Sequence, residues 1–153
     1  NGILIGRLSG IVAHHVPSYL KKNNLPSIKT NSIEDWEEKV SEICKETINE
    51  NMTTIGGIPS WVQMYFEKLL KKSNKKNITE LFKGLNLFVY GGVNFLPYEK
   101  IFNKLLGKKI NTIEYYPASE GFFAYQNSQK DKSLLLQYNS GLFYEFIKHI
   151  TKK

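Results

Sequence analysis

Residues 85–116 read LNLFVYGGVNFLPYEKIFNKLLGKKINTIEYY, and this stretch decides the fold class of the chain. It opens with an apolar, β-prone run that Gly91-Gly92 ends sharply. A helix is predicted from about Pro97, because apolar residues recur at helical spacing as far as Gly107, which suits a C-cap. The stretch closes with a second β-prone run. A strand, a helix and a strand in this order predict a right-handed parallel crossover, and therefore an α/β fold.

Two further amphipathic helices are predicted upstream of this unit. The first begins at Ser32, which has the spacing of a weak capping box with Asp35, and an apolar stripe follows at steps of three and four. The second begins near Pro59, a residue that suits the first turn of a helix, and ends in a basic segment at 71–76. Residues 52–55 form a short β-prone run between them. The chain is therefore expected to consist of strand–helix–strand units.

Three short β-like runs follow Gly121, at residues 122–126, 134–138 and 142–147. Their hairpin-like spacing predicts antiparallel pairing. Hydrophobic residues make up 41% of the 153 residues, enough for one core, and neither a repeat nor a low-complexity segment occurs.

The charge of the chain bears on its partners. Lys+Arg number 21 against 14 Asp+Glu, which gives a net charge of +7, but 20 of the basic residues are lysine and Arg7 is the one arginine. Arginine is the preferred fork for phosphate and bases, so we expect no nucleic-acid partner. A basic nucleic-acid-binding module is retained as an alternative function. For Arg7 itself, an ion pair and a carboxylate or phosphate clamp are both open.

No apolar run approaches the roughly 20 residues that span a bilayer, and no signal peptide is visible, so we expect no membrane partner and a cytoplasmic location. The chain starts at Asn1 rather than Met, which suggests that it begins inside something larger or has been trimmed. Cys44, the single cysteine, is predicted to be a small buried hydrophobe. His14 and His15 would point to opposite faces of a strand, so we expect no shared metal site there and leave their roles open.

Two segments stand at the C-terminal ends of the neighbouring predicted strands, Gly91-Gly92 and the run YPASEG at 116–121. In open α/β sheets ligands bind outside these ends. Glycine lets a ligand approach the backbone closely, although a tight turn without function explains Gly91-Gly92 equally well.

The second of these segments is chemically richer. Tyr116 offers a flat face for a purine ring, and Ser119 can donate to a phosphate oxygen. Glu120 can bind magnesium, which prefers carboxylate and phosphate oxygens together, and Gly121 keeps the exit uncrowded. A strand end with a buried tyrosine and an exposed Ser-Glu turn is the other interpretation, and these residues alone leave both open.

The segment 90–126 resembles the auxin-responsive Gretchen Hagen family of acyl-acid amido synthetases, which belongs to the adenylate-forming superfamily. YPASEG at 116–121 matches the family's Tyr-x-x-Ser-Glu-Gly nucleotide motif. YGGVNFLPY at 90–98 is similar to the glycine turn and helix start that precede that motif. The opening stretch 6–19 and GGIPSW at 56–61 are similar to bacterial-type members, so the resemblance covers nearly the whole chain.

The resemblance implies a fold and an activity. The fold would be part of the large N-terminal domain of an adenylate-forming enzyme, with strand–helix–strand units followed by short β-strands. The activity would be a ligase reaction: a carboxylic acid reacts with ATP to give an acyl-adenylate and pyrophosphate, and the amine of an amino acid then attacks to give an amide and AMP. Magnesium would neutralise the charge that builds on the phosphates.

The same resemblance assigns roles to individual residues. Tyr116 would pack against adenine, Ser119 would lie near the α-phosphate, and Glu120 would bind magnesium. Gly91 and Gly92 would line the adenine and acyl side with their backbone. The candidates for walls of the acyl pocket, for which a plain core role is the alternative, are Phe122, Phe123 and Trp61.

Parts of the family's pattern are missing. No Ser/Thr/Gly-rich phosphate loop precedes Ser9, and no ribose-binding aspartate motif follows Gly121, where Asp131 is the one remaining aspartate. The mobile C-terminal domain of the family is absent as well. We therefore expect residues 1–153 to be a single partial domain, the central portion of a larger adenylation domain, without turnover on its own. A degenerate relative that keeps the fold and has lost the chemistry is retained as an alternative.

Overall fold

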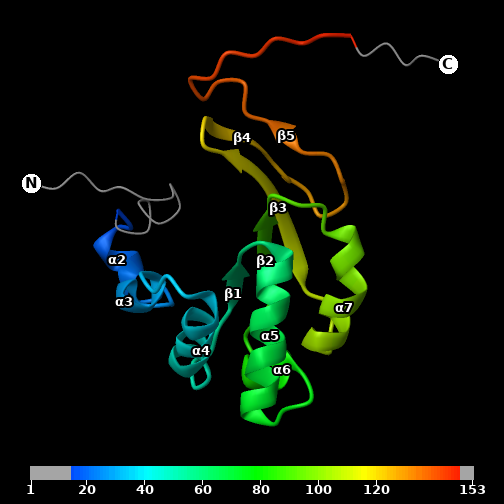
Figure 1. Ribbon diagram of the computed structural model, residues 1–153. Helices are drawn as coiled ribbons and strands as arrows, with labels where there is room; N and C mark the ends of the chain where they lie inside the picture. The colour runs from blue at the N-terminus through cyan, green and yellow to red at the C-terminus, as the bar shows by residue number, and fades with distance from the viewer. Residues whose placement is uncertain (1–14, 149–153) are drawn as a thin grey trace, which may run out of the picture.

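The computed structural model describes residues 15–148, and Figure 1 shows their course from short helices to a β-hairpin and an extended segment. Arg7 and His14 lie outside the described residues, whereas His15 is exposed. The elements are α2 (Ser18–Lys21), α3 (Ile28–Asn31), α4 (Trp36–Thr47), β1 (Thr54–Gly56), α5 (Pro59–Ser73), α6 (Ile78–Leu81), β2 (Leu87–Gly91), α7 (Leu96–Leu106), β3 (Asn111–Ala118), β4 (Gly121–Tyr125) and β5 (Leu135–Leu136).

These strands form one mixed sheet in the order β1-β2-β3-β4-β5. β1, β2 and β3 are parallel, and α7 connects β2 to β3, so the predicted parallel pairing across a helix is confirmed. β5 pairs antiparallel with β4, as the hairpin-like spacing of the runs after Gly121 predicts. β4 also pairs antiparallel with β3, which the sequence did not predict. The architecture is α/β, with a parallel part and an antiparallel edge.

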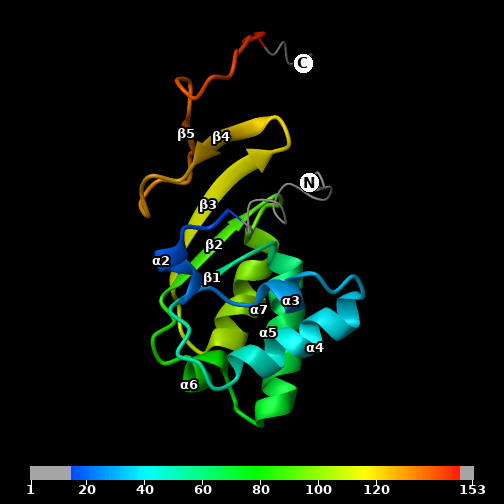
Figure 2. The same cartoon turned by 90° about the vertical axis from the view of Figure 1, so that its left-hand side faces the viewer.

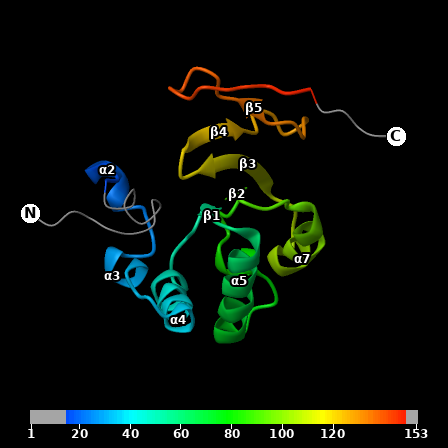
Figure 3. The same ribbon diagram turned by 45° about the horizontal axis from the view of Figure 1, so that its top comes forward.

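The helices α4, α5 and α7 lie on one side of the sheet, which is visible when Figure 2 and Figure 3 are compared. Phe102 of α7 stands at the centre of the core between helices and sheet. It is 1% exposed, and its ring centroid lies 4.9 Å from that of Phe88 in β2 and 5.7 Å from that of Phe66 in α5. Aromatic pairs of this kind add roughly 0.5–1.5 kcal/mol to the stabilisation that comes from burying their surface.

Several local predictions are confirmed. Pro59 is the first residue of α5, and Gly107 caps the C-terminus of α7 with a φ of +79°. Cys44 is fully buried in α4, and burial raises the pKa of its thiol. Among the described residues, no helix is both long enough and apolar enough to cross a membrane.

The helix predicted to begin at Ser32 begins later. Ser32 caps the C-terminus of α3 instead, and its Oγ donates to the Ile28 carbonyl oxygen at 2.8 Å. α4 begins at Trp36, and the carboxylate of Asp35 accepts the Glu38 N–H at 2.8 Å. The predicted capping box is wrong because Asp35 is itself the N-cap of the helix, a position that suits aspartate as well as serine.

The last two β-like runs form less strand than predicted. β5 is limited to Leu135–Leu136, and residues 142–147 belong to no strand of the described sheet. The side chains of Phe143, Phe146 and Ile147 are 87%, 82% and 92% exposed. Their β-prone composition is therefore not accompanied by pairing, because a strand requires a partner as well as suitable residues.

Candidate functional site

The C-terminal end of β2 carries the first predicted site segment. Gly91 is buried opposite Tyr115 of β3, and a Cβ at Gly91 would lie 2.5 Å from the Tyr115 carbonyl oxygen. Gly92 is exposed and has a φ of +82°, a left-handed conformation that favours glycine. The close approach of two strands thus explains Gly91, and Gly92 is the residue of the pair that presents its backbone to solvent.

The second predicted segment, residues 116–121, forms the tip of a β-hairpin. β3 continues through Ala118 and β4 opens at Gly121, so that Ser119 and Glu120 make the turn between them. Both turn residues are exposed. The predicted turn is therefore shorter than the six-residue run, whose first half extends β3 beyond the end of β2.

Tyr116 is 56% exposed, so the buried tyrosine of the alternative interpretation is wrong, whereas its exposed Ser-Glu turn at a strand end is confirmed. The pairing of β3 with β4 shifts register between Tyr116 and Pro117, because proline has no N–H to give to the ladder. The shift brings the rings of Tyr116 and Phe123 to a centroid distance of 5.3 Å, and Phe123 in turn meets Tyr144 at 6.2 Å. Tyr116 is thus held against an aromatic neighbour while more than half of its surface is open to a ligand.

The acidic group of the hairpin is a single carboxylate. No group of three or more His, Cys, Asp or Glu side chains suited to a metal occurs within residues 15–148. Magnesium is commonly held by one or two carboxylates together with substrate phosphates and water. The exposed Glu120, next to the Ser119 hydroxyl, fits such a partial role and provides no complete cage.

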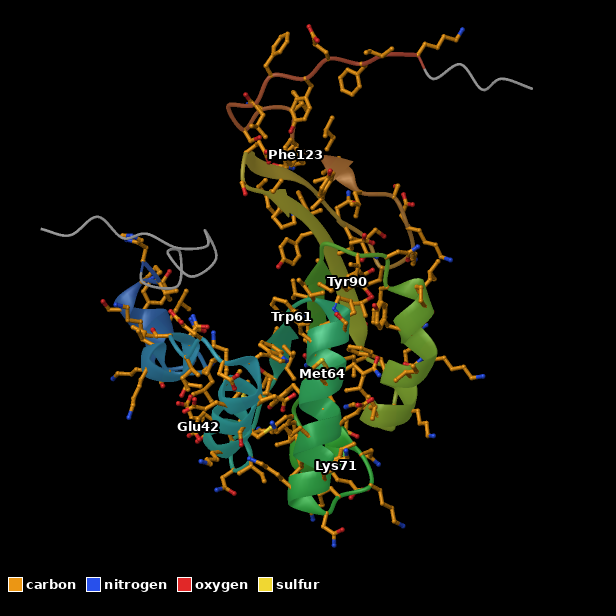
Figure 4. All side chains as sticks on the ribbon, in the orientation of Figure 1. Glu42, Trp61, Met64, Lys71, Tyr90 and Phe123 are labelled. Carbon is orange, nitrogen blue, oxygen red and sulfur yellow. The ribbon has the colours of Figure 1, made fainter. Side chains whose placement is uncertain are left out.

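The three candidate walls of an acyl pocket do not come together. Phe122 packs against Tyr115 on one face of the hairpin, with ring centroids 6.3 Å apart, whereas Phe123 packs against Tyr116. Trp61 lies on α5, away from the hairpin that carries Phe123 (Figure 4). Because Phe122 meets Tyr115 and Phe123 meets Tyr116, the two phenylalanines face opposite sides of the hairpin and do not line the same side of one pocket.

Trp61 lines a separate cavity of about 480 Å³ between β1, α4 and α5. Its ring lies 4.9 Å from that of Trp36, and the hydroxyl groups of Thr47 and Tyr65 lie 2.7 Å apart in the same wall. The other lining residues are mainly apolar or glycine, and they include Ile43, Met52, Ile55, Gly56, Gly57 and Val62. This cavity suits a flat apolar group of modest size.

A larger cavity, of about 840 Å³, lies beside α7 and is lined by residues of β2, β3 and the segment after β4. In its wall, the Tyr90 hydroxyl donates to Glu114 Oε2 at 3.1 Å. Burial, together with the carboxylates of Glu114 and Glu99, raises the pKa of Tyr90 to about 12. The phenol therefore stays protonated and serves as a fixed donor.

The Tyr90–Glu114 pair was not recognised in the sequence. These residues are 24 positions apart and become neighbours only through the parallel register that pairs Tyr90 with Glu114. The available signal was a carboxylate inside a β-prone run, because a charged residue in a strand needs a partner or solvent.

No family model matches the chain, and no match is found among the curated proteins.

Proposed function

We propose that this chain is part of the adenylation domain of an ATP-dependent ligase that activates a carboxylic acid as an acyl-adenylate and transfers it to the amine of an amino acid. The observation that carries the proposal is the exposed Tyr116 on the hairpin of the Tyr-x-x-Ser-Glu-Gly run. The run begins within β3, just past the end of the parallel neighbour β2, where α/β proteins bind ligands.

The hairpin supplies three kinds of contact to a nucleotide. Tyr116 offers an aromatic face, and its contact with Phe123 orients the ring. Ser119 offers a hydroxyl donor within the turn, and Glu120, the next residue of the same turn, offers a carboxylate. A bound magnesium ion would neutralise charge on the phosphates as pyrophosphate leaves, with Glu120 as its one ligand from this hairpin.

The cavity at Trp61 is the better candidate for the acid. Its paired indole rings and apolar wall suit the body of an aromatic or branched carboxylic acid. It lies next to Gly56 and Gly57, at the C-terminal end of β1, and so at the same edge of the parallel strands as Gly92. Of the acyl-pocket candidates we therefore retain Trp61 and propose a nucleotide-side packing role for Phe123.

The test is the affinity of the chain for AMP, measured by calorimetry or NMR titration. Base–aromatic stacking contributes roughly 1–3 kcal/mol, so Tyr116→Ala should weaken AMP binding by about tenfold or more. Tyr138→Ala is the matched control, because Tyr138 is another exposed tyrosine, at 80%, outside the hairpin. Equal AMP affinities for the two variants would refute the nucleotide role of Tyr116.

A second measurement addresses turnover. The phosphate loop and the ribose aspartate of the family are missing from these 153 residues, so the isolated chain should show no ATP–pyrophosphate exchange. Clear magnesium-dependent exchange would contradict this expectation. Exchange that also vanished in Tyr116→Ala would then assign complete adenylation chemistry to the chain itself.

A further inference from the structure

The 840 Å³ cavity beside α7 has the composition of a ligand site rather than of a packing defect. Its accessible apolar lining comes from Phe95, Leu96 and Ile110, which pack above the buried rings of Phe88 and Phe102. Its walls carry carboxylate, amide and phenol groups. Small-molecule sites typically measure about 300–1,000 Å³ and combine an apolar surface with a few converging polar groups.

Three carboxylates, those of Glu99, Glu114 and Asp131, line this cavity against two lysines, Lys109 and Lys132. Glu114 and Glu99 both act on the hydroxyl of the buried Tyr90, which is 7% exposed. Neither carboxylate forms an ion pair within residues 15–148, although the chain has a surplus of positive charge. Because Tyr90 donates as a neutral phenol, it orients Glu114 without cancelling its charge.

The wall opposite α7 is fixed in place by two glutamines. Gln126 accepts the Glu114 N–H at 3.2 Å and donates to the carbonyl oxygens of Ser128 and Asp131 at 2.8 and 3.2 Å. Gln129 donates to the Thr112 carbonyl oxygen at 2.6 Å. These bonds tie the segment after β4 to β3, so the cavity is formed before any ligand arrives.

We propose that this cavity binds a small amine, with its ammonium group on Glu114 and Glu99 and its apolar body against Phe95 and Leu96. The three carboxylates exceed the two lysines by one charge, so the lining leaves room for one ammonium group and disfavours a second cationic group. The ligand class is therefore a monoamine with an aromatic or compact aliphatic body. An amine is also the nucleophile of the proposed ligase, but this site is inferred from the cavity alone and requires no ATP.

The test uses benzylamine as the probe on the full chain, with benzyl alcohol as a neutral analogue and benzoate as an anionic one. Chemical shifts of backbone amides report both the affinity and the place of binding. We expect benzylamine to shift the amides of residues 112–114 and 126–132 and to bind at least about tenfold more tightly than benzyl alcohol. Equal binding of the two probes, or shifts confined to other parts of the chain, would overturn the proposal.

Two glutamate variants separate the charge from the fold. Glu114→Gln keeps an oxygen that can accept from Tyr90 and should weaken benzylamine binding by about tenfold, while benzyl alcohol binding stays the same. Glu67→Gln is the control, because Glu67 is an exposed carboxylate on α5 outside the cavity, and it should leave both affinities unchanged. Full benzylamine affinity in a folded Glu114→Gln variant would also overturn the proposal. AMP affinity measured in the same samples distinguishes a failure here from a failure of the proposed nucleotide site.

Discussion

The substitution Gly91→Ala tests the junction of β2 and β3 on which the proposed nucleotide site is built. A methyl group at Gly91 would lie 2.5 Å from the Tyr115 carbonyl oxygen, below the 3.0 Å that Cβ atoms essentially never cross. The contact is with backbone, so no side-chain rotation relieves it and the two strands must separate. Overpacking of this kind costs about 1–3 kcal/mol, which corresponds to a fall in Tm of roughly 2–12 °C for a domain of this size.

Gly56→Ala is the matched control for this prediction. Gly56 ends β1 as Gly91 ends β2, but a Cβ at Gly56 would lie 3.7 Å from the Val89 carbonyl oxygen, an ordinary contact. The free energy of unfolding of the Gly56→Ala variant should stay within about 0.5 kcal/mol of that of the unsubstituted chain. Alanine makes no close contact there and also restricts the unfolded chain more than glycine does. Urea denaturation followed by circular dichroism measures both variants. If Gly91→Ala proved as stable as Gly56→Ala, the close approach of β2 and β3 would be incorrect.

Three further predictions concern the core and its titrating groups. Phe102→Ala should lower the free energy of unfolding by about 3–5 kcal/mol in urea denaturation, because it leaves a cavity at the centre of the core. A loss below about 1 kcal/mol would contradict that packing. Tyr90 should ionise near pH 12 in a titration followed by tyrosinate absorbance, and the stability it contributes should be lost as the pH rises from about 10 through that value. Burial also raises the pKa of Tyr65, so the readout is the absorbance change near pH 12 that Tyr90→Phe removes, and an unchanged curve in that variant would refute the assignment. Partial burial tends to raise the pKa of Glu46, but hydrogen bonds from Ser27 and Thr30 outweigh it, and the pKa is lowered. These hydrogen bonds should therefore stabilise the fold above the ordinary glutamate pKa, and this stabilisation should be lost as the pH falls through the lowered pKa. Glu46→Gln should flatten the acid limb of a stability–pH curve, and an unchanged limb would contradict this.

The parts of the fold that follow from local pattern were predictable. The β-prone runs on either side of α7, the glycine that ends this helix and the proline that begins α5 each carry their signal within a few residues. The error at Ser32 is of a different kind. Ser32 and Asp35 are both good capping residues. Local pattern does not reveal that the short helix α3 ends at Ser32 and that α4 begins only after Asp35.

The candidate site was predictable only in part. The hairpin run was found from its residues, and its exposed tyrosine agrees with a binding role. The grouping of Phe122 with Phe123 was avoidable, because alternation along a strand already separates adjacent side chains. The Tyr90–Glu114 pair was not predictable from spacing, since it depends on the register between two strands that only the folded sheet sets.

The proposed nucleotide site on the β3–β4 hairpin is tested most directly by mapping AMP binding on the chain with NMR. The proposed site predicts that AMP shifts the backbone amides of Gly92, Ser119, Glu120 and Gly121 together with the ring signals of Tyr116, and that the benzylamine-sensitive amides of 126–132 move little. Two results would contradict the claim that this hairpin is one wall of a nucleotide site. One is amide shifts confined to other elements, and the other is no amide shift even at AMP concentrations high enough to saturate a weak nucleotide site.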